Sequence, residues 1–82
     1  MNETQARELV LTAIADVAPE IDTDTVDPDT SLRDGADLDS MDFLAYISTV
    51  SETIGVDVPE DDYERLDTVN AAVAYVVEKS AD

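Results

Sequence analysis

The sequence contains neither cysteine nor histidine among its 82 residues. Their absence excludes disulfide bonds, thiolate or imidazole metal ligands, Ser-His-Asp triads and Cys-His dyads. No apolar run approaches the roughly 20 residues that a membrane span needs. Residues 1–4 are too polar and acidic to begin a signal peptide. We therefore expect a cytoplasmic protein that does not cross a membrane.

Basic residues are also scarce, because four lysines and arginines face 21 acids and the formal net charge is −17. Such a field repels nucleic acid and anionic membranes and attracts basic protein surfaces. We expect neither nucleic acid nor a membrane as a partner, while solubility and adaptation to a salty cytoplasm stay open as explanations of the acidity. The hydrophobic content of 44% is typical of a globular chain. Residues 1–82 are predicted to form a single, monomeric domain with a modest core.

Apolar residues recur at helical spacing in three stretches, residues 3–18, 40–54 and 68–80. Pro19 and Gly55 mark the ends of the first two stretches. Tyr75 is expected at the edge of the core with its hydroxyl at the surface. The predicted core residues lie on the apolar faces of these three helices: Ala6, Leu9, Val10, Ala13, Ile14, Val17, Phe43, Ile47, Val50, Ile54, Val69, Ala72, Val73 and Val76.

A shorter segment over residues 60–66 is predicted to make one or two helical turns, with Tyr63 and Leu66 pointing inward. The predicted fold class is therefore all-α. It is a small four-helix bundle with three main helices, a short third helix, and a long loop between helices 1 and 2.

The long loop, residues 19–39, is rich in aspartate. Loops of this length in compact domains often carry function. EF-hand registers that begin at Asp22 or Asp27 lack the glycine at position six and the carboxylate at position twelve, so neither fits a calcium loop. We predict no specific metal site, and weak, nonspecific cation association stays open.

The loop ends at Asp39-Ser40-Met41, where the second helix is predicted to begin. Ser40 can itself be the N-cap, since a serine oxygen accepts hydrogen bonds from the free N–H groups of a first turn. Alternatively, Asp39 is the N-cap with Asp42 as a capping-box partner, and Ser40 is the first helical residue with a free hydroxyl. A phosphate ester on that hydroxyl would lie at the positive end of the helix dipole, which favours an anion.

Asp39-Ser40-Met41 resembles the Asp-Ser-Leu motif of acyl carrier proteins, whose serine carries a 4′-phosphopantetheine arm at the start of the second helix. The resemblance covers residues 3–80 and implies the same order of helices. It also implies that Ser40 is the attachment site, flanked by Asp39 and Met41, and that the arm carries acyl groups as thioesters. Three further stretches resemble family motifs: Asp29-Thr30-Ser31-Leu32, Gly55-Val56-Asp57-Val58-Pro59 and Thr68-Val69.

The resemblance implies a carrier and not an enzyme. A phosphopantetheinyl transferase would move the arm from coenzyme A to the serine, and acyl-loading and acyl-processing enzymes with basic docking patches would bind the loaded protein. The second helix is the main docking surface of the family, and Tyr46 is expected to be exposed on it. The predicted docking residues are Asp37, Asp39, Asp42, Tyr46 and Glu52.

Ala45, Ser48 and Ser51 depart from the more acidic second helix of the family. Ser48 and the expected exposed Tyr46 argue against a standard fatty-acid role and favour a specialised pathway, such as secondary metabolism, polyketide biosynthesis or an acyl or aminoacyl transfer system. Neutral drift on a solvated face explains these departures equally well. The alternative function is an acidic helical protein-interaction module without a prosthetic group, in which Ser40 is only a cap.

Overall fold

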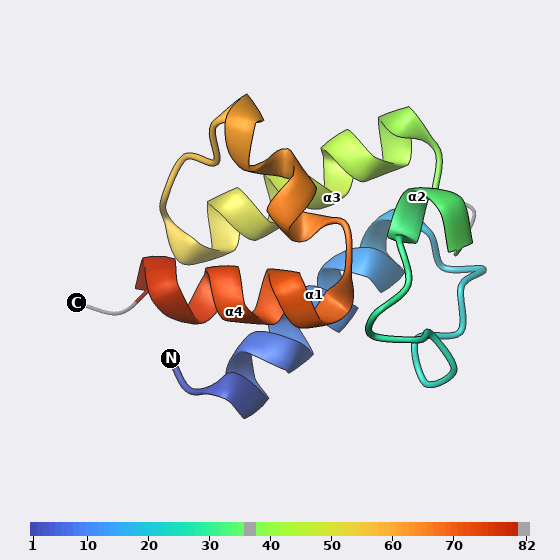
Figure 1. The fold of residues 1–82 in the computed structure, drawn as a ribbon, viewed down its shortest axis with the longest axis horizontal. Coiled ribbons are helices and arrows are strands. Elements are labelled where there is room, and N and C mark those ends of the chain that lie inside the picture. Colours follow the sequence, from blue (N-terminus) through green and yellow to red (C-terminus); the bar gives the residue numbers. More distant parts are fainter. Residues whose placement is uncertain (36–37, 81–82) are drawn as a thin grey trace.

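The structure is a computed structural model that describes residues 1–35 and 38–80. Every regular element in this part of the chain is a helix, which confirms the predicted all-α fold with a long connection after the first helix. None of these helices is long and apolar enough to cross a membrane. In chain order they are α1 (Glu3–Val17), α2 (Leu32–Gly35), α3 (Ser40–Ile54), the 3₁₀ helix η1 (Glu60–Leu66) and α4 (Val69–Ser80) (Figure 1).

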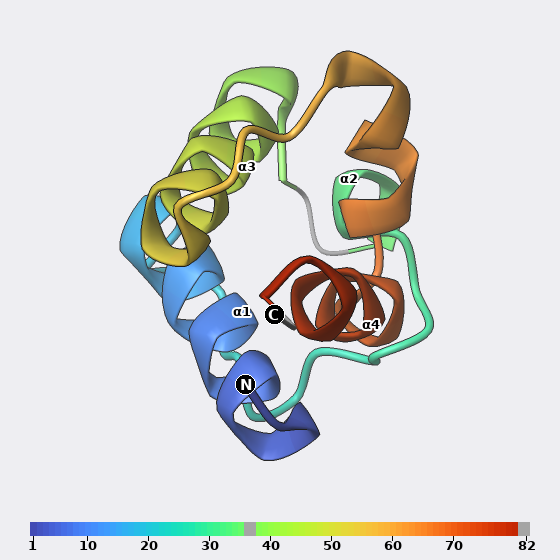
Figure 2. The same cartoon turned by 90° about the vertical axis from the view of Figure 1, so that its left-hand side faces the viewer.

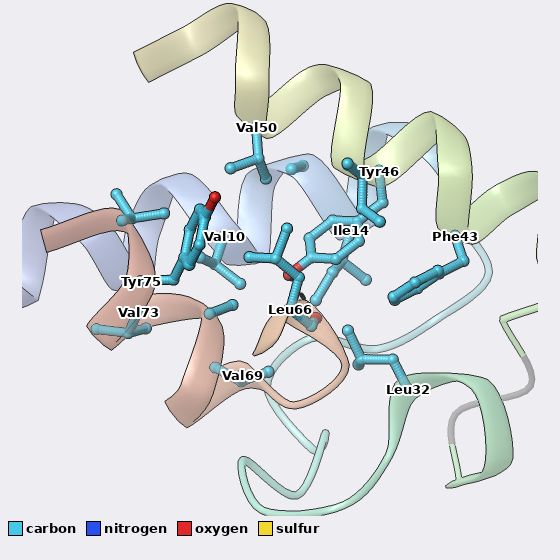
Figure 3. Close-up of a cluster of buried hydrophobic side chains, with 14 of the residues drawn as sticks. Val10, Ile14, Leu32, Phe43, Tyr46, Val50, Leu66, Val69, Val73 and Tyr75 are labelled. Carbon is cyan, nitrogen blue, oxygen red and sulfur yellow. Dashed lines mark hydrogen bonds between the residues drawn. The ribbon is translucent and has the colours of Figure 1, made fainter. Parts of the chain in front are cut away.

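The helices enclose one apolar core. α1 packs against both α4 and α3, while η1 packs against α4 and α2 against α3. Figure 2 shows α1 and α3 on one side of the molecule and α4, η1 and α2 on the other. Each large apolar side chain buried between them contributes roughly 1.5–3 kcal/mol of transfer free energy. Val76 is among the largest fully buried side chains. Figure 3 labels others of this group: Val10, Ile14, Leu32, Tyr46, Val50, Leu66, Val69 and Tyr75.

Side chains and one glycine fix the helix ends. At α1, the Asn2 side chain accepts from the Gln5 N–H at 2.8 Å, and the Gln5 side chain accepts from the Asn2 N–H at 3.1 Å, a capping box that the sequence analysis did not anticipate. α3 ends at Gly55 with a φ of 69°, as predicted. The hydroxyl of Thr68 accepts from the Ala71 N–H at 3.1 Å and caps α4.

α2 anchors the end of the long loop. The Leu32 N–H donates to the Asp67 carbonyl at 2.6 Å, and the Leu38 N–H donates to the Leu32 carbonyl at 3.1 Å. Both leucine side chains are buried. A Cβ at Gly35 would lie 2.0 Å from Cγ2 of Thr30, so a larger residue there would require the exposed Thr30 side chain to move. The chain is thus fixed immediately before α3 begins.

The expected surface position of the Tyr75 hydroxyl is wrong. The Tyr75 side chain is fully buried, and its hydroxyl donates to the Asp62 carboxylate at 2.8 Å. Burial, together with this hydrogen bond, raises the pKa of Tyr75 to about 12. The tyrosine lies at the edge of the core as expected, because Arg65 and Lys79 lie over its ring, but its hydroxyl joins α4 to η1 and does not reach solvent.

Candidate functional site

The start of α3 is capped by Asp39. The Asp39 backbone is extended, with φ −76° and ψ 176°, and its Oδ1 accepts from the Asp42 N–H at 2.8 Å. The Phe43 N–H donates to the Asp39 carbonyl at 2.8 Å. Of the two interpretations, the structure supports Asp39 as the N-cap, and Ser40 is the first residue of α3. Asp42 does not complete a capping box with the described residues, so that part of the expectation is wrong.

The Ser40 side chain is exposed. Within residues 1–35 and 38–80, its hydroxyl forms no hydrogen bond, and the N–H groups of Ser40 and Met41 find no acceptor. The first N–H groups of a helix attract an anion, because they lack intrahelical acceptors and lie at the positive end of the dipole. The site therefore fits a phosphate ester on the Ser40 oxygen.

Two apolar side chains flank the serine. Met41 is 81% exposed and Leu44 is 49% exposed, although both are large and apolar. They project from the first two turns of α3, next to Ser40. An exposed apolar surface of this kind beside a polar rim is typical of a contact site for another molecule.

The acids predicted to dock partners are partly exposed in the structure. Asp39 and Glu52 are exposed, and Asp42 is half-buried. Asp37, also predicted as a docking residue, lies outside the described residues. The described acids of the long loop do not gather into a cluster that could hold a metal ion.

Tyr46 was predicted as an exposed docking residue, and the structure contradicts this. Its side chain is fully buried, and its hydroxyl donates to the Leu66 carbonyl at 3.0 Å (Figure 3). Burial raises the pKa of the Tyr46 hydroxyl well above its usual range. The signal was present in the sequence, because Tyr46 lies three residues after Phe43 and four before Val50, on the apolar face of the helix.

A polar network near the site was missed in the sequence analysis. The Asp67 carboxylate accepts from the Ser31 hydroxyl at 2.6 Å and from Arg33 Nε at 3.1 Å. Burial acts to raise the pKa of Asp67, but the hydrogen bonds from Ser31 and Arg33 outweigh it and hold that pKa below its usual range. The Arg33 guanidinium also lies over the ring of Phe43, one turn after Ser40. No local sequence pattern links these residues, because 34 positions separate Arg33 from Asp67.

An exposed serine at the first position of a helix, in a small acidic bundle, fits the class of proteins that carry a group on a covalent arm. Residues 8–76 match the family model described as "Phosphopantetheine attachment site". The chain is 36% identical over 72 residues to an acyl carrier protein of Lactobacillus johnsonii, covering 84% of this chain and 90% of that one. It is 33% identical over 75 residues to an acyl carrier protein of Rubrobacter xylanophilus, with 88% and 93% covered. It is 30% identical over 81 residues to one of Thermosynechococcus vestitus, with 99% of both chains covered.

The chain therefore belongs to the phosphopantetheine attachment site family, among the acyl carrier proteins. Its cofactor is 4′-phosphopantetheine, and it is a carrier and not an enzyme. Membership implies interaction with a phosphopantetheinyl transferase and with acyl-processing enzymes.

Proposed function

We propose that the 4′-phosphopantetheine arm is attached to Ser40 Oγ and that the protein carries acyl groups on it. The observation that supports this most directly is the division of roles at the start of α3. Asp39 caps the helix, so the exposed Ser40 hydroxyl is left without a structural hydrogen bond to the described residues. When bound, the arm supplies the thiol that forms the acyl thioester, which a chain without cysteine cannot supply itself.

The residues around Ser40 have separate roles in this proposal. Asp39 fixes the first turn through the Asp42 N–H, and the Ser40 side chain is left exposed. The N–H groups of Ser40 and Met41, which find no acceptor among the described residues, would be available to the phosphate of the arm. Ser40 is a substrate of the transferase, because the sequence has no histidine to activate the hydroxyl. The Asp39 carboxylate is engaged by the Asp42 N–H, and the Ser40 hydroxyl forms no hydrogen bond with the described residues, so we propose that the transferase supplies the base for Ser40.

We further propose that partners dock on α3 and the end of the long loop through basic patches. Exposed Asp39 and Glu52, half-buried Asp42, and Asp37 supply the acidic rim, while Met41 and Leu44 supply apolar contact next to the serine. The net charge of −17 disfavours nucleic acid and anionic membranes as partners. We also propose that the protein is a monomer of one domain. It would lie in the cytoplasm, where coenzyme A supplies the arm.

The pathway we favour is a specialised acyl or aminoacyl transfer or polyketide system. Ala45 and Ser48 are exposed on α3, so partner enzymes meet fewer acids there than on the typical helix of the family. Ser51 has a structural role instead, because its hydroxyl donates to the Val56 carbonyl at 2.7 Å and closes the turn after α3. Tyr46, which was expected to be exposed, is buried and no longer supports this argument, so the proposal of a specialised pathway depends on Ala45 and Ser48.

The test is the mass of the intact protein after incubation with coenzyme A and a phosphopantetheinyl transferase. We expect the wild type and Ser48→Ala to gain one phosphopantetheinyl group and Ser40→Ala to gain none. Ser48 is the matched control, since it is another exposed serine on α3. An unmodified wild type would support the alternative, an acidic interaction module without a prosthetic group, and a modified Ser40→Ala would place the arm elsewhere.

A further inference from the structure

Arg33 connects α2 to the turn that carries Ser40. Its guanidinium carbon lies 4.5 Å from the centre of the Phe43 ring. The Phe43 N–H donates to the Asp39 carbonyl, so this ring belongs to the first hydrogen-bonded turn of α3. A cation over an aromatic face is attracted by the ring quadrupole and restricts its position. Arg33 therefore contacts the first turn of α3 from outside.

Asp67 fixes Arg33 from a third part of the chain. Asp67 Oδ1 accepts from Arg33 Nε at 3.1 Å and from the Arg33 N–H at 3.3 Å. Ser31 donates to the same carboxylate, and the Asp67 carbonyl accepts from the Leu32 N–H. α2 is thereby tied to the junction of η1 and α4, and the planar guanidinium is held in one orientation.

A backbone hydrogen bond makes a second connection between α2 and Ser40. The Leu38 N–H donates to the Leu32 carbonyl at 3.1 Å, and the Leu38 side chain is buried. Leu38 directly precedes Asp39, the cap of α3. The turn that presents Ser40 is thus held on one side through Leu38 and on the other through Phe43, and both connections meet at α2.

We infer that Arg33 is a positioning residue for the modification of Ser40. By joining Phe43 to Asp67, it holds the first turn of α3 in the orientation in which the Ser40 hydroxyl is presented to the transferase. Correct orientation of a reacting group lowers the barrier of a group-transfer step without any new contact to the reacting atoms. This inference rests on the proposed attachment at Ser40.

Arg65 offers a matched control. It pairs with the Glu78 carboxylate and lies 4.8 Å from the centre of the Tyr75 ring, so it makes the same two kinds of contact as Arg33. The side chains of Arg33 and Arg65 are 41% and 44% exposed. Arg65 joins η1 to α4 and not to the first turn of α3. Replacing either arginine by alanine removes the same charge and the same kind of contact.

The experiment compares wild type, Arg33→Ala, Arg33→Lys and Arg65→Ala in two measurements. The first is kcat/KM for phosphopantetheinyl transfer. The second is amide hydrogen exchange of Leu38, Asp42 and Phe43 in the protein before modification. We expect Arg33→Ala to lower kcat/KM about fivefold and to speed exchange of these three amides about fivefold. Arg65→Ala should stay within about twofold of wild type in both. Arg33→Lys should restore kcat/KM and amide exchange only partly toward the wild-type values, because a lysine ammonium lacks the planar shape of the arginine guanidinium.

Equal kinetics and exchange for Arg33→Ala and Arg65→Ala, with a wild type that is modified, would overturn the inference. Full recovery by Arg33→Lys would also overturn it, since charge alone would then explain the effect. Uniformly faster exchange throughout the chain of Arg33→Ala would show a global and not a local loss of stability, and it would also overturn the inference. A wild type that takes up no arm would reject the attachment proposal separately, and the local exchange would still decide whether Arg33 holds the turn.

Discussion

The Asp39 carboxylate accepts a hydrogen bond from the Asp42 N–H at 2.8 Å, across the residue whose hydroxyl is the proposed attachment point. Because the cap is supplied one residue earlier, Ser40 has no capping task in the described structure. Stability and modification are thus assigned to neighbouring side chains, and substitutions can separate the two.

Ser40→Ala should abolish modification and leave stability nearly unchanged, whereas Asp39→Ala should lower stability and only slow modification. Ser40→Ala should change the free energy of unfolding by no more than about 0.5 kcal/mol, since it breaks no cap, and should abolish uptake of the arm. Asp39→Ala should cost about 1 kcal/mol through the lost cap and should slow uptake without abolishing it. Chemical denaturation and intact mass measure the two effects. A cost of a full kcal/mol for Ser40→Ala, with an unmodified wild type, would show that Ser40 is the cap.

Tyr46→Phe should destabilise the fold from within the core. The substitution leaves the Leu66 carbonyl without the hydrogen bond that it accepts at 3.0 Å. An unpaired buried carbonyl costs about 1–3 kcal/mol. Tyr63→Phe is the control, because Tyr63 is only half-buried and its hydroxyl forms no hydrogen bond with the described residues. Equal unfolding midpoints for the two variants in urea would contradict this prediction.

Association with the transferase should slow as ionic strength rises. The charge of −17 steers a basic partner over long distances, and salt screens that attraction. Stopped-flow association rates between low and high salt measure the effect. Glu52→Gln, on α3, should slow association about twofold at low salt, while Glu8→Gln, on the exposed side of α1, should have little effect. Rates that do not respond to salt would reject steering.

The contribution of Asp67 to stability should disappear in acid. Its pKa is lower in the folded protein than the ordinary aspartate value of 3.8, so folding favours the ionised form. This stabilisation is fully present above pH 3.8 and is lost as the pH falls through the lower folded-state pKa. Wild type should exceed Asp67→Asn by up to about 1 kcal/mol near neutral pH, because the pair is partly exposed.

The difference in unfolding free energy between wild type and Asp67→Asn should begin to narrow below pH 3.8 and should close below the lower folded-state pKa of Asp67. Asp57→Asn is the control for the loss of one acidic charge, since Asp57 is exposed and accepts no side-chain hydrogen bond from the described residues. A constant gap between wild type and Asp67→Asn from neutral pH into acid would contradict the assignment.

The helices were predictable because their signals are local. The apolar period of 3.6 residues and the glycine after Ile54 predict α3 with the bounds that the structure has. The same period placed Phe43, Ile47 and Val50 in the core, where the structure has them. The surface positions expected for Tyr46 and for the Tyr75 hydroxyl were wrong, because a tyrosine hydroxyl can be buried where it finds an acceptor. Those acceptors lie on η1. Leu66 is 20 residues from Tyr46, and Asp62 is 13 residues from Tyr75.

The sequence by itself determined the helical class, the acidic surface and the serine that resembles a carrier site, since each depends on composition, period or a contiguous motif. Only the tertiary structure decided that Asp39 and not Ser40 is the cap, because both residues can accept from the same first turn. It alone also brought Arg33, Phe43 and Asp67 together beside Ser40. Those contacts join segments that meet only after the bundle has closed, and no local pattern encodes them.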